Sequence, residues 1–184
     1  EAGALAMLQP RRREALWEVR GLSHSPTSAL LAPPTKDDTP AFEALNLQQN
    51  IVWDYRSSSH SPWGHPLVTL RSALTAQRLP DARTIATMRH EQQTRYAGLV
   101  ICRQRPSTAA GVVFMTLEDE TGFVNVVIWK TVFDEHALIA KTASFLGVTG
   151  KIQKADGVVH LVADKLWPPH PEQQPTDVSS RDFH

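Results

Sequence analysis

The stretch GVVFMTLEDETGFVNVVIWK, residues 111–130, decides the fold of this chain. Each half alternates apolar residues with others, and a tight turn that ends at Gly122 separates the halves. Because the side chains of a β-strand point alternately to opposite faces, the pattern predicts a hairpin with one apolar face. That face consists of Val113, Met115, Leu117, Val124, Val126 and Ile128.

The opposite face of the hairpin carries rings and amides where a fully solvated sheet would carry charges. Its residues are Phe114, Thr116, Asn125, Val127 and Trp129. Aromatic rings stack on unpaired bases, and an amide both donates to and accepts from a base edge. We therefore predict base contacts from Phe114, Thr116, Asn125 and Trp129. In the alternatives, Phe114 packs under the N-terminal helical segment, Asn125 bonds a neighbouring strand, and Trp129 packs at the strand end.

Further strand signals lie on both sides of the hairpin. Residues 96–103 alternate with Ala97, Leu99 and Ile101 as the apolar set. Residues 145–153 and 158–166 form a second hairpin across an Asp-Gly step, which favours a tight turn. Between the hairpins, a helix is predicted over 132–142, with an apolar side formed by Val132, Phe133, Leu138 and Ile139.

The order β-β-β-α-β-β is that of the five-stranded oligonucleotide-binding (OB) barrel. We assign residues 94–167 to this all-β fold. The preceding part is mainly helical and is predicted to pack on the barrel, so the whole chain is small α+β. Residues 1–22 are helical, 23–93 form a linker and a helical connector, and 168–184 form a flexible, proline-rich tail. In the connector, a helix starts near Pro66 and Asp81 caps another.

Composition excludes several classes of protein. Lys plus Arg equals Asp plus Glu at 19 each among 184 residues, whereas a non-specific DNA-coating protein is more basic. The single Cys102 excludes an internal disulfide and a multi-cysteine zinc site, and it fits a reducing cytosolic compartment. No apolar run approaches the ~20 residues of a membrane span, so no membrane partner is expected. The chain opens without a methionine, which indicates a piece of something longer.

Basic and polar residues flank the two loops that line the cleft of an OB barrel. They are Arg103, Arg105, Lys151, Gln153 and Lys154. We predict that they meet a phosphate backbone, although solvated surface charge is the alternative for each. Residues 95–167 hold eight Lys or Arg against seven Asp or Glu, so only modest affinity is expected.

Three other groups of residues were weighed for chemistry. The acidic triplet 118–120 lies on a strand end and turn, so we interpret it as a solvated hairpin turn with diverging side chains. His60 and His65 have no cysteine or carboxylate nearby in sequence, and His65 is expected to cap or pack at a helix start. The basic run 11–13 could touch duplex phosphates. No metal or catalytic residue is predicted.

Several segments together resemble the C-terminal region of bacterial error-prone DnaE-type DNA polymerases, the ImuC group of the C family. They are RRREALWEVRGL (11–22), Tyr55 followed by His65-Pro66-Leu67, VICRQRPSTAAGVVFMTLEDETG (100–122), VVIWKTVFDEH (126–136) and the closing SRDFH. The resemblance spans nearly the whole chain, with the elements in the expected order. It implies that residues 1–22 end a helix-hairpin-helix region.

The resemblance also implies a function. The parent protein would be a magnesium-dependent DNA polymerase of translesion synthesis and SOS mutagenesis, with its catalytic carboxylates elsewhere and no active site or cofactor in this fragment. The fragment would guide single-stranded template in the bacterial cytoplasm, at the nucleoid. ImuB-like or ImuA-like partners would link it to the sliding clamp. The degenerate clamp peptide at 49–53 favours this branch. The alternatives are a module that docks such a partner, or the OB domain of a replicative polymerase III alpha subunit.

Overall fold

The computed structural model describes residues 4–24, 40–58, 60–155, 157–169 and 181–183. The chain forms two compact units, residues 1–63 and 64–184. Residues 64–93, which the sequence assigned to a connector, belong to the same unit as the barrel. The predicted linker at 25–39 lies outside the described residues.

The first unit contains helices α1, Arg12–His24, and α2, Leu47–Ser58. A buried aspartate joins them: Arg12 Nη1 donates to Asp54 Oδ1 at 2.6 Å, and Ser61 Oγ donates to Asp54 Oδ2 at 2.6 Å. Such a carboxylate is stable away from water because both of its oxygens are bonded. This ion pair fixes α1 against α2.

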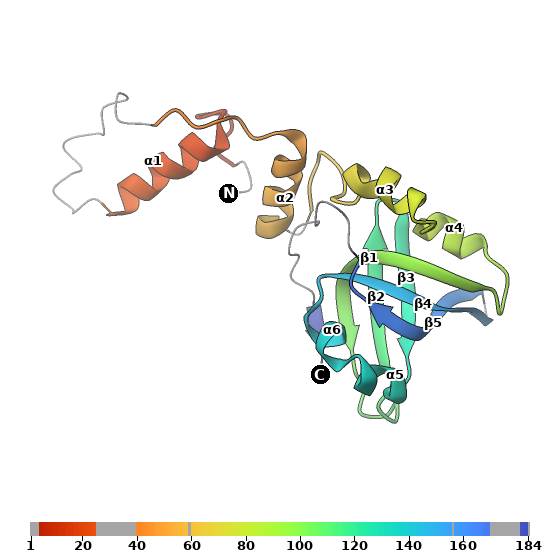
Figure 1. The fold of residues 1–184 in the computed structure, drawn as a ribbon. Helices are drawn as coiled ribbons and strands as arrows, with labels where there is room; N and C mark the ends of the chain where they lie inside the picture. Colours follow the sequence, from red (N-terminus) through yellow and green to blue (C-terminus); the bar gives the residue numbers. More distant parts are fainter. Residues whose placement is uncertain (1–3, 25–39, 59, 156, 170–180, 184) are drawn as a thin grey trace. The chain divides into compact units, whose positions relative to one another are not determined.

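The second unit is built on a closed five-stranded barrel (Figure 1). Its strands are β1, Gln93–Gln104; β2, Val113–Asp119; β3, Gly122–Ile128; β4, Phe145–Ala155; and β5, Val158–Trp167. The neighbours run β1-β2-β3-β5-β4 and return to β1, and only the β3–β5 pair is parallel. The predicted OB topology is confirmed.

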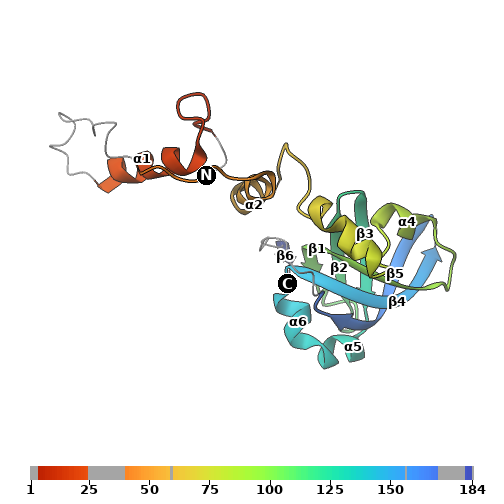
Figure 2. The same cartoon turned by 45° about the horizontal axis from the view of Figure 1, so that its top comes forward.

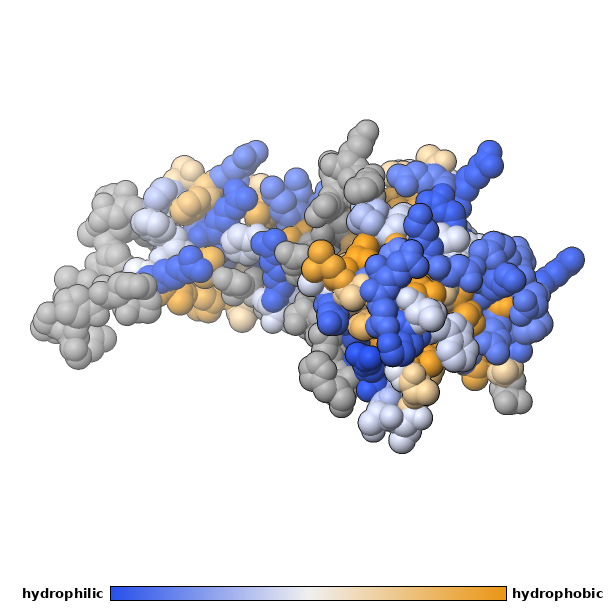
Figure 3. Space-filling view, turned by 60° about the horizontal axis from the view of Figure 1, so that its bottom comes forward, coloured by the Kyte–Doolittle hydropathy of each residue, from blue (hydrophilic) through white to orange (hydrophobic). Residues whose placement is uncertain are grey.

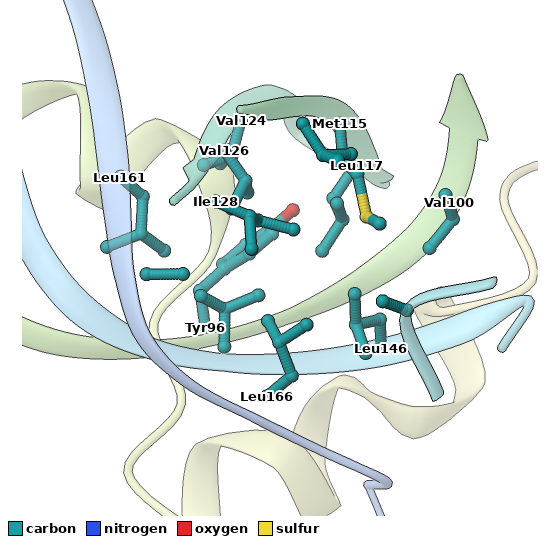
Figure 4. Packing of buried hydrophobic residues seen from close by; sticks show 14 of the residues in the cluster. Tyr96, Val100, Met115, Leu117, Val124, Val126, Ile128, Leu146, Leu161 and Leu166 are labelled. Carbon is teal, nitrogen blue, oxygen red and sulfur yellow. The ribbon is translucent and has the colours of Figure 1, made fainter. Parts of the chain in front are cut away.

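The apolar face of the β2–β3 hairpin fills the barrel, as predicted. All six alternating residues are at most 3% exposed and belong to one core cluster. Figure 4 shows the ring of Tyr96 lying among their aliphatic side chains. Burial of a side chain of this size contributes on the order of 2 kcal/mol, so the hairpin supplies a large share of the barrel's stability.

The predicted alternation of β1 describes its burial only in part, although Ala97 and Leu99 are buried. Five consecutive residues, Tyr96–Val100, are buried, and it is Tyr96 and Val100 that join the barrel core. A strand buried on both faces shows no period of two, and an irregularity in the register between Val100 and Cys102 shifts the phase as well. The set Ala97, Leu99 and Ile101 therefore does not face the interior.

The predicted helix between the hairpins is two short helices, α5, Lys130–Glu135, and α6, Ala137–Thr142. The backbone at His136, with φ −112° and ψ 27°, interrupts the helix. Phe133 is buried in the barrel core, and Val132 and Ile139 pack against this core as expected. Leu138 was wrongly placed on the apolar side: it is 78% exposed, because the break turns α6 relative to α5.

The connector consists of η3, Val68–Leu70; α3, Arg71–Ala76; and α4, Ala82–Thr87. Asp81 caps α4 as predicted, with Thr84 N donating to its Oδ1 at 2.8 Å. Ala82 and Ile85 belong to the barrel core, which confirms that the connector packs on the barrel. Figures 1 and 2 show α3 and α4 at one end of the barrel and α5 and α6 at the other.

His65 opens the connector in the role predicted for it. Its Nδ1 accepts a hydrogen bond from Leu67 N at 3.1 Å, and its carbonyl accepts one from Val68 N at 3.1 Å. The ring is buried beside the barrel, with Nε2 4.0 Å from Glu118 Oε2. Burial lowers its pKa to about 4, and this effect exceeds the opposing effect of the nearby carboxylates.

The C-terminal residues 181–183 form a short strand, β6, Arg181–Phe183. It pairs in parallel with Cys102–Gln104 of β1. The tail was predicted to be flexible, and residues 170–180 lie outside the described part. A segment as short as residues 181–183 is too short to show an alternating pattern, so the sequence does not predict this strand. In the part of the chain that is described, no helix has both the length and the apolarity to cross a bilayer.

Candidate nucleic-acid interface

The outer face of the β2–β3 hairpin carries the predicted base-contacting residues. Phe114 and Thr116 lie on β2, and Asn125 lies on β3, directly opposite Thr116. Their neighbours in sequence point inward and fill the core, so these side chains must point out. Phe114 is 37% exposed, and Asn125 is also exposed. The structure therefore brings three of the predicted residues together on an accessible surface.

Thr116 and Asn125 bond each other across the hairpin. Thr116 Oγ1 donates to Asn125 Oδ1 at 3.4 Å. This is the strand-to-strand bond that the sequence left open as an alternative role for Asn125. The bond occupies one lone pair of the amide oxygen and leaves the amide NH₂ group able to donate to a ligand.

The outer surface continues from β3 onto β5 and β4 as the barrel curves round to β1. In register, Asn125 lies beside His160, and His160 lies beside Gln153. We call Thr116, Asn125, His160 and Gln153 the polar row. The next row consists of Phe114, Val127, Val162 and Lys151, which we call the apolar row although it ends in a lysine. Adjacent strands are about 4.8 Å apart, so each row is a continuous line of side chains that curves around the closed barrel.

Sequence reasoning missed two members of this face, Phe123 and His160. Phe123 alternates in phase with Asn125, lies opposite Glu118 and is 62% exposed. The period of two in β3 was sufficient to find it. His160 lies beside Asn125 only because β3 and β5 pair in parallel, and no local pattern connects residues so far apart in the chain.

The residues of β4 that were predicted to contact phosphates lie in two different places. Lys151 and Gln153 are exposed on β4, at the ends of the two rows. Lys154 lies next to the connector: its Nζ donates to the Ala86 carbonyl at 3.3 Å, and its backbone N donates to His90 Nδ1 at 3.1 Å. Lys151 and Gln153 thus belong to the face, and Lys154 lies at its edge.

The two arginines of the β1–β2 loop lie against α5 and α6. Arg103 Nε donates to the Ala140 carbonyl at 2.9 Å, and its Nη2 donates to the carbonyl of Ala143. These carbonyls end α6, where a cation also compensates the helix dipole. The Arg105 guanidinium lies 5.1 Å from the ring centroid of Phe133. Both side chains therefore have structural partners of their own, and only Arg105 is exposed.

Trp129 lies between the end of β3 and the start of α5. It occupies the N-cap position of α5 and is 54% exposed. It lies two residues beyond Val127 of the apolar row and continues the outer alternation of β3. Its ring is thus available at the end of the face nearest α5, and the predicted base contact stays a prediction.

The acidic triplet is not the solvated turn that was predicted. The Asp119 side chain is fully buried, and its Oδ2 accepts from Ala82 N at 2.7 Å and from Arg71 Nη2 at 3.1 Å. Its Oδ1 accepts from the backbone N and the hydroxyl of Thr121, at 2.8 Å and 2.7 Å. Glu120 also binds Arg71, so the two carboxylates converge rather than diverge. The triplet fastens the connector to the barrel.

This cluster changes the proton affinity of its members. Burial alone would lower the pKa of Arg71, but Glu120 and Asp119 raise it overall. Burial, followed by the charge of Asp119, raises the pKa of Glu118 and raises that of Tyr96 well above its usual value. The described residues contain no group of three or more His, Cys, Asp or Glu arranged to hold a metal ion. The cluster is a buried, hydrogen-bonded ion pair between the connector and the barrel.

The basic run of the first unit is bonded within that unit. Arg11 pairs with Glu14 at 2.8 Å, and Arg12 pairs with Asp54. Arg13 Nη1 donates to the Glu43 carbonyl at 3.2 Å. The contact of this run with duplex phosphates stays a prediction.

Comparison with known proteins agrees with this geometry. Residues 96–169 match the family model of the OB-fold nucleic acid binding domain. The chain is 42% identical over 171 residues to an error-prone DNA polymerase of Caulobacter vibrioides, covering 90% of the chain and 16% of the relative. It is 39% identical over 183 residues to the error-prone DNA polymerase of Alkalilimnicola ehrlichii, covering 100% of the chain and 18% of the relative.

The resemblance stated from the sequence is thereby confirmed, for a chain that spans less than a fifth of the length of these curated relatives. Among solved structures, asparaginyl-tRNA synthetase from Pyrococcus horikoshii aligns with a TM-score of 0.42 and 24% identity. The alignment covers 48% of the chain and 22% of the synthetase. At this TM-score, the structural likeness carries no functional weight.

Proposed function

We propose, from the premise that this chain is homologous along its length to a segment of bacterial error-prone DNA polymerases, that its barrel binds and guides single-stranded template DNA. The parent protein would carry out translesion synthesis during the SOS response, in the cytoplasm at the nucleoid, with its magnesium-dependent active site in other domains. The observation that carries the proposal is the open outer face of β2–β3, where Phe114 is exposed beside the Thr116–Asn125 pair.

Three kinds of contact follow from the geometry. The ring of Phe114 stacks on a base, the amide of Asn125 bonds a base edge, and Lys151 neutralises a phosphate at the far end of the apolar row. A single lysine on the face predicts a shallow dependence of affinity on salt, because few counterions are released. The barrel thus acts together with a larger DNA-binding body.

The first unit also offers exposed apolar side chains on which a protein partner could dock. There, Met7 is 98% exposed, Leu8 is 84% exposed and Trp17 is 51% exposed. Where exposed apolar residues form a contiguous patch, they favour binding of a protein partner. On the face that Figure 3 presents, hydrophobic surface is broken up by strongly hydrophilic side chains. We propose that an ImuB-like or ImuA-like partner contacts the first unit and links the polymerase to the sliding clamp.

Replacing Phe114 by alanine tests the DNA proposal. Loss of one stacked base costs about 1–3 kcal/mol, so Phe114→Ala should weaken binding about 5- to 150-fold. The measurement is fluorescence anisotropy of a labelled single-stranded oligonucleotide, titrated with the whole chain at low and at moderate salt. Leu138→Ala is the matched control, because Leu138 is an exposed apolar residue on α6, outside the face. This variant should bind as the wild type does.

Two results would contradict the proposal. The first is the absence of measurable binding by the wild type even at low salt. The second is an equal loss of affinity in Phe114→Ala and Leu138→Ala, which would show that a general apolar surface, not a stacking ring, holds the oligonucleotide.

A further inference from the structure

His160 occupies the centre of the outer face, one strand beyond the predicted site. It lies beside Asn125 of β3 on one side and beside Gln153 of β4 on the other. Its neighbours in sequence, Val159 and Leu161, contribute to the core or pack against it, so the imidazole belongs to the outer surface.

The two ring nitrogens of His160 differ in their surroundings. Nδ1 is sealed from solvent and has no hydrogen-bond partner among the described residues, whereas Nε2 is not sealed in this way. A polar atom buried without a partner is costly, and a protein retains it where something else is gained. His160 lies in register with Asn125 and Gln153, whose amides donate and accept.

Two exposed rings lie on either side of the polar row. Phe114 lies opposite Val127, and Phe123 lies four residues away from Val127 along β3. At about 3.4 Å per residue, the two rings are roughly 13 Å apart along the strand direction. Stacking platforms at this separation bracket the line of amide, imidazole and hydroxyl groups. The arrangement suits consecutive unpaired bases, the outer two stacked and the one between them bonded at its edge.

We propose that His160 is a direct base-contacting residue and that the nucleic-acid face extends from β2 across β3 and β5 to β4. The ligand is an unpaired strand of at least three nucleotides. Its outer bases stack on Phe114 and Phe123, and its central base bonds His160 Nε2 and the flanking amides. This inference rests on the proposed function, and it deepens that function by adding His160 and Phe123 to the site and by assigning Gln153 to a base edge rather than to a phosphate.

Base-bearing and abasic strands distinguish this role from a structural one. His160→Ala should weaken binding of a short oligothymidylate about 3- to 10-fold, as expected for one lost hydrogen bond. It should leave binding of an abasic strand of equal length unchanged, because that strand offers only phosphates and sugars. His160→Gln keeps a polar group at the row and should restore most of the loss. His136→Ala is the matched control, a half-buried histidine between α5 and α6.

The outcomes distinguish a base-contacting role of His160 from a structural one. Equal affinity of His160→Ala and His136→Ala for oligothymidylate overturns the inference. An equal loss on oligothymidylate and on the abasic strand also overturns it, because His160 would then act through the fold or the phosphates. If Phe114→Ala still weakens binding in either case, the proposed function survives without its extension. Failure of the wild type to bind any strand overturns both.

Discussion

Replacing Asp119 by alanine is expected to lower the free energy of unfolding of the barrel unit by about 3–5 kcal/mol, the cost of removing one partner from a buried ion pair. The substitution leaves Arg71 with Glu120 alone. It also removes the acceptor of Ala82 N and of both donors of Thr121. The measurement is urea denaturation followed by far-ultraviolet circular dichroism. Because Asp119 accepts from Ala82 N at the start of α4, α4 should lose protection from hydrogen exchange first.

The matched control is Asp134→Ala. Asp134 pairs with Lys130 on the exposed surface of α5, where both side chains are more than half accessible. Solvated pairs of this kind contribute below about 1 kcal/mol. Similar losses in the two variants would contradict the structural role assigned to Asp119, since an aspartate on a solvated turn would then be an equally good description.

Acidification is expected to destabilise the barrel unit through His65. The folded-state pKa is about 4, and the unfolded-state value is about 6.5, so between these pH values the unfolded chain binds more protons. The free energy of unfolding therefore falls as the pH drops from 6.5 to about 4, and His65 does not lower it further below pH 4. The difference in pKa corresponds to roughly 3 kcal/mol. The physical cause is burial, which disfavours the charged imidazolium, and protonation of Nδ1 would also end the hydrogen bond that it accepts from Leu67 N.

His65→Asn isolates this contribution from that of the other titrating groups. Glu118, Asp119, Glu120 and Arg71 face the same site and are unchanged in the variant. Asparagine can still accept from Leu67 N but does not titrate. The free energy of unfolding of both proteins is measured by urea denaturation at pH 7 and at pH 4. On going from pH 7 to pH 4, the wild type should lose roughly 3 kcal/mol more of this free energy than the variant does. A pH-independent difference between them would contradict the assigned protonation.

The sequence was sufficient to predict the parts of the fold that depend on local patterns. The β2–β3 hairpin, the Asp81 cap and the His65 helix start are local patterns, and each is present as predicted. The strand β1 was misjudged because it is buried on both faces, which removes the period of two. Leu138 was misjudged because one backbone conformation at His136 divides the helix, and the residue pattern does not encode it.

Long-range contacts explain most of what was missed at the site. Arg71 and Asp119 are 48 residues apart, so an acidic triplet could only be interpreted as a turn. Arg103 was assigned to phosphate because its loop lies at the cleft, whereas the end of α6 takes up its guanidinium. His160 joins the face through a parallel pairing. In each case the sequence provides the residue type, and the closure of the barrel provides its partner.

Photo-crosslinking tests the central claim most directly. The whole chain is bound to a short single-stranded oligonucleotide that carries 5-bromodeoxyuridine, irradiated and digested, and the crosslinked peptides are identified by mass spectrometry. Binding on the outer face predicts crosslinks in β2 and β3, at Phe114 and Phe123, with a further crosslink in β5 near His160. Crosslinks confined to α1 and α2, or to α5 and α6, would contradict it.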